Sequence, residues 1–72
     1  MEEMIYHSKA VMRAVQYALV IADLPFLSYQ ASIRDAVYNA GCLLKYGGVD
    51  AVKLEGGKEF AATVKAIVDA GI

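Results

Sequence analysis

Two apolar runs, each followed by an acidic residue, form the clearest pattern along this sequence. The first, at 17–22, shows no polar alternation and stops at Asp23. Such a run is typical of a parallel strand that is covered on both faces. The second, at 49–54, is more mixed and stops at Glu55. We therefore predict strands at 17–22 and 49–54, the first followed by a loop because Pro25 cannot donate to a strand ladder.

Three other stretches place apolar residues at the three- and four-residue steps of an amphipathic helix. The first covers 2–13. The second begins after Ser32, a favourable N-cap with Asp35 three positions on, and Gly47-Gly48 ends it. The third covers 58–70. The expected inner positions of the second and third helices are Ile33, Val37, Ala40, Leu43 and Leu44, and Phe60, Ala61, Val64, Ile67 and Val68.

The predicted order is helix, strand, helix, strand, helix. Strands joined through a helix are parallel, and the crossover is right-handed. The pattern of strand, acid, loop and helix occurs twice, about 32 residues apart. Gly71 ends the last helix, and Ile72 has the character of the start of another strand. We predict an α/β fold of two βα units from a (β/α)8 TIM barrel, with 1–72 a single partial domain too short to be a complete enzyme.

The composition predicts that the chain packs against more protein. Of its 72 residues 58% are hydrophobic, and the mean hydropathy is +0.42. Average soluble domains are about 45–50% apolar, and a domain of this size buries only about 60% of the surface that its unfolded chain exposes. We therefore expect its apolar surface to be covered by further barrel strands or by other copies of the chain.

Charge and hydropathy argue against membrane and nucleic-acid partners. The longest uncharged stretches, such as 24–33, have about ten residues, half of the roughly 20 that a membrane-spanning helix needs. The start, Met1-Glu2-Glu3-Met4, is acidic where a secretory signal would be basic, so we expect a cytoplasmic protein. Seven basic and eight acidic residues give a net charge of -1, without the basic cluster that phosphate binding requires.

Asp23 and Glu55 are the first candidate site residues, because each follows a strand at the equivalent place. In a barrel both would lie at the mouth where the βα loops build active sites. Their carboxylates are the hard oxygen ligands that suit Mg²⁺. The alternative is that each carboxylate only caps the next helix.

Lys53 lies two residues before Glu55, so its side chain is expected on the same side of the sheet. A buried lysine there would need an anion, either a substrate carboxylate or Glu55 itself. The alternative is a side chain that extends outward into solvent. Tyr29 is the only tyrosine expected near the same mouth.

Three other features carry weaker signals. Cys42 has no cysteine partner and an apolar setting, which predicts an inert, buried thiol. His7 is the only histidine and has no second ligand nearby, so we expect a structural or solvent-facing role. Gly56-Gly57 could hold an anion through free N–H groups or form a plain turn.

Four motifs together resemble one enzyme family. They are ADLPF at 22–26, SYQ at 28–30, NAG at 39–41 and GG-x-D-AVKLEGG at 47–57. In this combination and spacing they resemble ketopantoate hydroxymethyltransferase, also called 3-methyl-2-oxobutanoate hydroxymethyltransferase. The resemblance covers essentially the whole chain.

The resemblance implies a (β/α)8 barrel that transfers a hydroxymethyl group from 5,10-methylenetetrahydrofolate to 3-methyl-2-oxobutanoate, giving 2-dehydropantoate. It implies that Mg²⁺ chelates this 2-oxo acid and stabilises its enolate. By motif position Asp23 and Glu55 would bind the metal, and Asp23 and Lys53 would contact the substrate. The family also implies a homo-oligomer.

The sequence departs from the family pattern in three ways. The preceding Gly-Asp-Ser strand and the downstream glutamate base are absent, so no catalytic base is expected on this chain. Arg13-Ala14-Val15 replaces the usual Arg-Gly-Ala. We therefore expect a fragment that is inactive alone. The alternatives are a non-catalytic module that associates with itself, or a Mg²⁺-dependent barrel with lyase or mutase activity on another 2-oxo acid.

Overall fold

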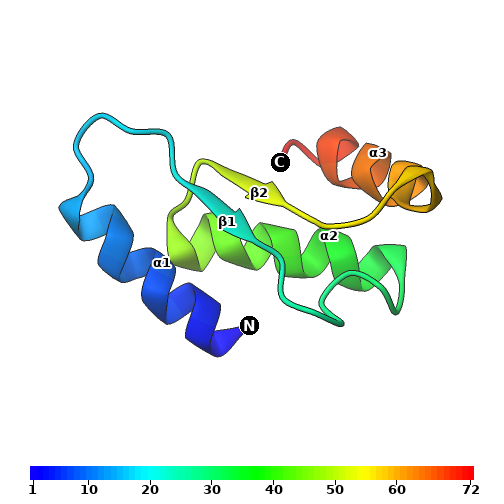
Figure 1. The fold of residues 1–72 in the computed structure, drawn as a ribbon, viewed down its shortest axis with the longest axis horizontal. Helices are drawn as coiled ribbons and strands as arrows, with labels where there is room; N and C mark the ends of the chain where they lie inside the picture. Colours follow the sequence, from blue (N-terminus) through cyan, green and yellow to red (C-terminus); the bar gives the residue numbers. More distant parts are fainter.

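The structure, a computed structural model, describes residues 1–72 as helices alternating with two short strands (Figure 1). The predicted order of helix, strand, helix, strand and helix is confirmed. A π-helical turn, η1, prolongs the second helix, and a 3-10 turn, η2, precedes the third. The elements are α1 (Glu2–Ala14), β1 (Ile21–Asp23), α2 (Ile33–Cys42), η1 (Leu43–Gly47), β2 (Ala51–Lys53), η2 (Lys58–Phe60) and α3 (Ala61–Asp69).

β1 and β2 form a parallel two-stranded sheet in which Ile21 lies opposite Ala51, and Asp23 opposite Lys53. The connection between them runs through α2, as parallel pairing requires. The α/β class and the two parallel βα units are therefore confirmed. A closed barrel needs strands beyond these two and stays a prediction.

α2 is the central helix of the molecule. α3 packs against α2, α1 packs against η1, and α1 and α3 lie at opposite ends in Figure 1. Ala36 and Ala40, one turn apart on α2, are fully buried, and Leu43 is the largest fully buried side chain. Small residues at this spacing let neighbouring elements approach the helix closely. The other apolar core residues are Ala22, Leu24, Tyr29, Val49 and Ile67.

The start of α2 follows the sequence prediction. Ser32 is the N-cap, and its hydroxyl oxygen accepts a hydrogen bond of 3.0 Å from the backbone N–H of Asp35. The helical segment formed by α2 and η1 ends at Gly48, whose φ of +79° is the left-handed conformation that glycine adopts without strain. Cys42, predicted to be buried, is only partly so, because it lies near the exposed face of α2.

α1 meets η1 at a close contact between two small residues. A Cβ atom on Gly47 would lie only 3.1 Å from Cβ of Ser8. Ser8 is buried, and its hydroxyl donates a 2.7 Å hydrogen bond to the carbonyl of Met4 one turn earlier. The helix ends at Ala14, followed by extended backbone at Val15.

The strands are shorter than predicted, and the prediction that both faces of the first are covered is wrong. Instead of 17–22, β1 covers Ile21–Asp23, and only Ala22 is buried. Tyr17 is 96% exposed and Leu19 is 70% exposed. The reason is that β1 pairs along one edge only, over three residues of β2, so nothing in this chain lies beside 17–19. The second strand covers 51–53 rather than 49–54 for the same reason.

The predicted inner stripe of the third helix is only partly correct. Ile67 and Thr63 are buried, whereas Val64 and Val68 are exposed and line an open apolar groove beside β2. These valines face the unpaired edge of β2, where no neighbouring strand covers them. The N–H of Ile72 donates to the carbonyl of Ile67 at 3.3 Å and so caps the end of the third helix, and a strand that starts at Ile72 stays a prediction.

None of the helices combines the length and the apolar character that crossing a membrane requires.

Candidate functional site at the carboxyl ends of the strands

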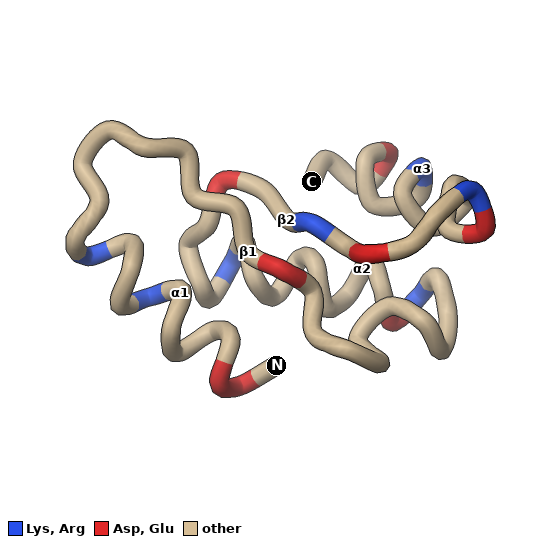
Figure 2. Tube along the Cα trace, in the orientation of Figure 1, with Lys and Arg blue, Asp and Glu red and all other residues tan.

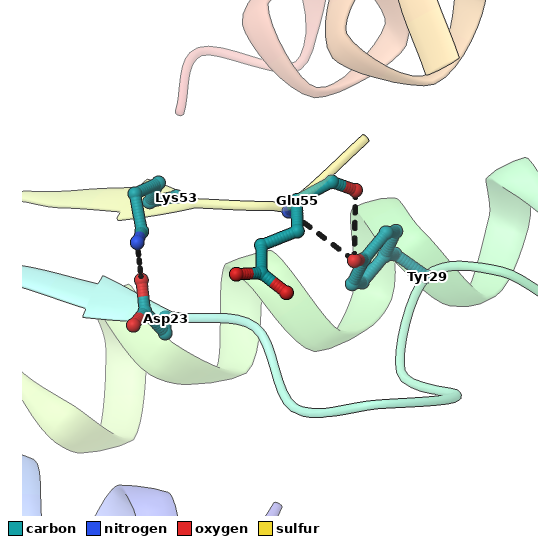
Figure 3. Close-up of polar contacts among 4 residues, drawn as sticks. All are labelled: Asp23, Tyr29, Lys53 and Glu55. Carbon is teal, nitrogen blue, oxygen red and sulfur yellow. Dashed lines mark hydrogen bonds and ion pairs between the residues drawn. The ribbon is translucent and has the colours of Figure 1, made fainter. Parts of the chain in front are cut away.

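Asp23 and Lys53 are the last residues of β1 and β2 and lie opposite each other in the parallel register. Lys53 Nζ is 2.9 Å from Asp23 Oδ1 (Figure 3). The side chain of Lys53 is 57% exposed and that of Asp23 is 60% exposed. Lys53 is therefore not the buried lysine that its place in a strand suggested. The anion that it contacts is Asp23, a partner that the sequence did not predict for it.

Opposite charges lie side by side at this edge of the sheet. Figure 2 shows basic and acidic positions next to each other where the two strands end. The pKa of Lys53 is raised, first by its hydrogen bond to Asp23 and the charge of that carboxylate, and to a smaller extent by the charge of Glu55. Lys53 therefore carries its positive charge in contact with the carboxylate of Asp23, and the charge of Glu55 adds a weaker effect.

Glu55 lies two residues after the end of β2, and its carboxylate points toward the segment after β1 (Figure 3). No hydrogen bond or ion pair within the chain involves this carboxylate. The capping alternative for Asp23 and Glu55 is wrong, because α2 has Ser32 as its N-cap, and Gly57 and Phe60 occupy the cap positions before η2 and α3. Neither carboxylate is used as a helix cap: that of Asp23 is paired with Lys53, and that of Glu55 is unpaired.

Tyr29 connects the two loops that follow the strands. Its ring is 5% exposed, and its hydroxyl donates a 2.9 Å hydrogen bond to the carbonyl of Glu55 and accepts one of 3.2 Å from the Glu55 N–H. The sequence placed Tyr29 near the mouth but did not reveal these bonds. The available signal was an aromatic residue with a polar tip in a loop without charged residues.

The loop after β1 is held by its own polar groups. The Ser28 hydroxyl donates to the carbonyl of Pro25 at 2.6 Å, and the Asn39 amide on α2 donates to the carbonyl of Ser28 at 2.7 Å. The N–H of Leu27, which has a φ of +69°, donates to the Gln30 side-chain oxygen at 2.6 Å. The SYQ and NAG motifs thus supply the bonds that shape this loop.

The Gly56-Gly57 pair forms a turn. Gly56 has a φ of +137°, and a Cβ there would lie 2.2 Å from a ring carbon of Phe60. The N–H of Gly57 donates to the Glu59 carboxylate at 3.2 Å, and hydrogen bonding to the backbone of Glu59 itself and then of Gly57 lowers the pKa of Glu59. Because Glu59 already occupies this N–H, the plain turn is favoured over an anion cradle.

The other residues singled out lie apart from these contacts. His7 is exposed on α1 and packs edge to face against the ring of Tyr6, with 5.5 Å between ring centroids. No three His, Cys, Asp or Glu residues come together in a group that could hold a metal ion.

Two carboxylates at one edge still match one common mode of Mg²⁺ binding. Mg²⁺ is often held by one or two carboxylates, with waters and substrate oxygens completing its octahedral shell. Asp23 and Glu55 supply hard oxygens at the ends of adjacent strands, and the Glu55 carboxylate is unpaired. These two residues therefore fit Mg²⁺, provided that the metal either shares the Asp23 carboxylate with Lys53 or displaces Lys53 from it.

Acidic and basic side chains at the carboxyl ends of parallel strands are the arrangement from which α/β barrel enzymes build their active sites. The model of the family described as ketopantoate hydroxymethyltransferase matches residues 1–72. The chain belongs to this family, as its motifs indicated.

Curated relatives carry the name 3-methyl-2-oxobutanoate hydroxymethyltransferase. The chain is 69% identical over 72 residues to the protein of Moorella thermoacetica. The matched region is 100% of this chain and 27% of that relative. The chain is 62% identical to that of Geobacter metallireducens, with the same coverage, and 60% identical to that of Clostridium beijerinckii, covering 26% of it. The chain thus spans about a quarter of the length of these relatives.

Proposed function

We propose that this chain supplies the Asp23, Lys53 and Glu55 part of the active site of a hydroxymethyltransferase. The reaction transfers a hydroxymethyl group from 5,10-methylenetetrahydrofolate to 3-methyl-2-oxobutanoate and yields 2-dehydropantoate. Family membership over residues 1–72 and the names of the relatives support this proposal. The observation that carries it is the pairing of Lys53 with Asp23 at 2.9 Å, beside the free carboxylate of Glu55.

Lys53 is suited to bind the carboxylate of the 2-oxo acid. Its side chain is more than half exposed, so an entering anion can reach it without unfolding the strand. Asp23 holds the ammonium at the strand end until then, and its negative charge keeps Lys53 protonated. Substrate binding would exchange one carboxylate partner of Lys53 for another.

Asp23 and Glu55 are suited to hold Mg²⁺ beside this position. When bound, Mg²⁺ would withdraw charge from the keto oxygen of the substrate, which makes the neighbouring carbon easier to deprotonate. No residue of this chain is assigned as the base, and we propose that another part of the longer protein supplies it. Assembly into a homo-oligomer and a cytoplasmic location remain predictions.

The test uses the full-length protein that carries this chain. Lys53→Met should raise KM for 3-methyl-2-oxobutanoate about tenfold or more, because a charge-assisted hydrogen bond is worth roughly 1.5–3 kcal/mol, and 1.4 kcal/mol corresponds to a factor of ten. Lys65→Met is the matched control, since Lys65 also makes an exposed ion pair, with Asp69 at 2.6 Å, but lies on α3. Its KM should stay at the wild-type value.

Product formation decides between this function and its alternatives. A wild-type protein that makes no 2-dehydropantoate but turns over another 2-oxo acid would favour the lyase or mutase hypothesis. A protein inactive on all 2-oxo acids, with a mass that rises with concentration, would favour the self-associating module. Equal KM values for Lys53→Met and Lys65→Met would refute the role of Lys53.

A further inference from the structure

We propose that Tyr29 is a positioning residue, which holds the backbone at Glu55 and thereby sets the region that the Glu55 carboxylate can reach. The role as a metal ligand that this carboxylate would serve rests on the proposed function. The positioning itself rests on contacts within the chain.

A single hydroxyl group holds both backbone polar groups of Glu55. Tyr29 Oη donates to the Glu55 carbonyl at 2.9 Å and accepts from the Glu55 N–H at 3.2 Å. The last hydrogen bond between the strand ends is the one from the N–H of Leu24 to the carbonyl of Lys53, at 2.8 Å. Beyond it the sheet provides no partner for Glu55, so the phenol takes the place of a neighbouring strand.

The ring of Tyr29 is fixed on its other sides. Phe60 packs edge to face against it, with 5.3 Å between centroids and 69° between ring planes. Phe60 reaches this place because the backbone turns at Gly56, where its ring leaves no room for a Cβ. Ser28, the preceding residue, is bonded to the Asn39 amide of α2. Hydrogen bonds thus connect α2 to the loop after β1, and this loop, through the Tyr29 hydroxyl, to the segment after β2.

The carboxylate of Glu55 depends on this support more than that of Asp23 does. Asp23 lies within β1 and its side chain is bonded to Lys53, whereas no side chain of the protein contacts the Glu55 carboxylate by a hydrogen bond or an ion pair. The region that this carboxylate can reach is therefore set by the position of its backbone and of its Cα–Cβ bond. Because a displacement of about 1 Å in a site can cost a factor of 100 in rate, a backbone clamp at this residue has functional weight.

The test compares Tyr29→Phe with Tyr38→Phe in the full-length protein. Tyr29→Phe removes the hydroxyl and keeps the ring against Phe60, and Tyr38 is an exposed tyrosine of α2 that serves as the control. In Tyr29→Phe we expect hydrogen exchange of the Glu55 amide to accelerate at least tenfold, and Mg²⁺ affinity measured by calorimetry without substrate to fall about tenfold. Tyr38→Phe should match the wild type in both measurements.

A double variant separates positioning from general stability. If Tyr29 acts through Glu55, Tyr29→Phe should weaken Mg²⁺ binding in the wild-type background and have no further effect in a Glu55→Gln background. An equal loss of affinity in both backgrounds would show a merely structural role and overturn the proposal. So would unchanged exchange at the Glu55 amide in Tyr29→Phe, whether or not the protein is active. A wild-type protein that makes no 2-dehydropantoate would instead overturn the proposed function, and the amide exchange would still decide about Tyr29.

Discussion

The two segments that flank β1 differ in how they are held. The segment before it, 15–20, leaves Tyr17 and Leu19 exposed and forms the arc that extends away from the rest of the chain in Figure 1. The segment after it, 24–32, buries Leu24, Ser28 and Tyr29 and is bonded to α2 and to the end of β2.

The difference shows which end of the sheet is complete within this chain. At the carboxyl end, the loop residues satisfy one another, so the site residues are held by local contacts. At the amino end, Val20 packs against the core, but the side chains of Tyr17 and Leu19 are left exposed by these 72 residues. The candidate site is therefore held by buried side chains and loop hydrogen bonds, whereas 15–20 is held mainly near Val20, which is hydrogen-bonded to Asp50.

The largest expected effect distinguishes a tyrosine in each segment. Tyr29→Ala removes a buried ring and two hydrogen bonds, and should cost about 3–5 kcal/mol of unfolding free energy. Tyr17→Ala should change it by less than about 0.5 kcal/mol in the same chain, because that ring contacts almost only solvent. Urea unfolding of both variants measures this. Equal costs would contradict the difference, and a larger cost of Tyr17→Ala in the full-length protein would show that another part of that protein covers this segment.

A smaller effect is expected at the side chains that anchor each segment. Asn39→Ala leaves the partly buried carbonyl of Ser28 without its donor and should cost about 1–3 kcal/mol. Asp50 accepts a 2.9 Å hydrogen bond from the N–H of Val20 in an exposed setting, so Asp50→Ala should cost less than about 1 kcal/mol. Thermal unfolding of the two variants side by side checks the order, and a reversed order would show that 15–20 is the better anchored segment.

The smallest effect is the pH dependence of the Asp23 and Lys53 pair. Because the folded state raises the pKa of Lys53, the pair contributes its stability at and below the usual lysine range and loses it as pH rises through the higher folded value. Both side chains are largely exposed, so the contribution is small and salt reduces it further. NMR titration of Lys53 in the wild type and in Asp23→Asn should show a higher midpoint in the wild type. Identical midpoints would mean that the pair does not persist in solution.

Local rules in the sequence were sufficient to predict much of the fold. The helix start at Ser32, the helix end near Gly48 and the order of elements depend on neighbouring residues, and all are confirmed. Strand lengths were overestimated at 17–22 because an apolar run shows that a segment can be buried but not whether a neighbour is present. The exposed Val64 and Val68 have the same explanation.

For the site, the sequence by itself determined that an acidic residue stands at the end of each apolar run and that Lys53 lies on the same side as Glu55, because alternation along a strand sets the side on which each side chain lies. Only the tertiary structure decided the partners. The register of β1 with β2 pairs Lys53 with Asp23, and loop closure places Tyr29 on the backbone of Glu55, 26 positions away. These contacts join segments far apart in the chain, so no local pattern encodes them.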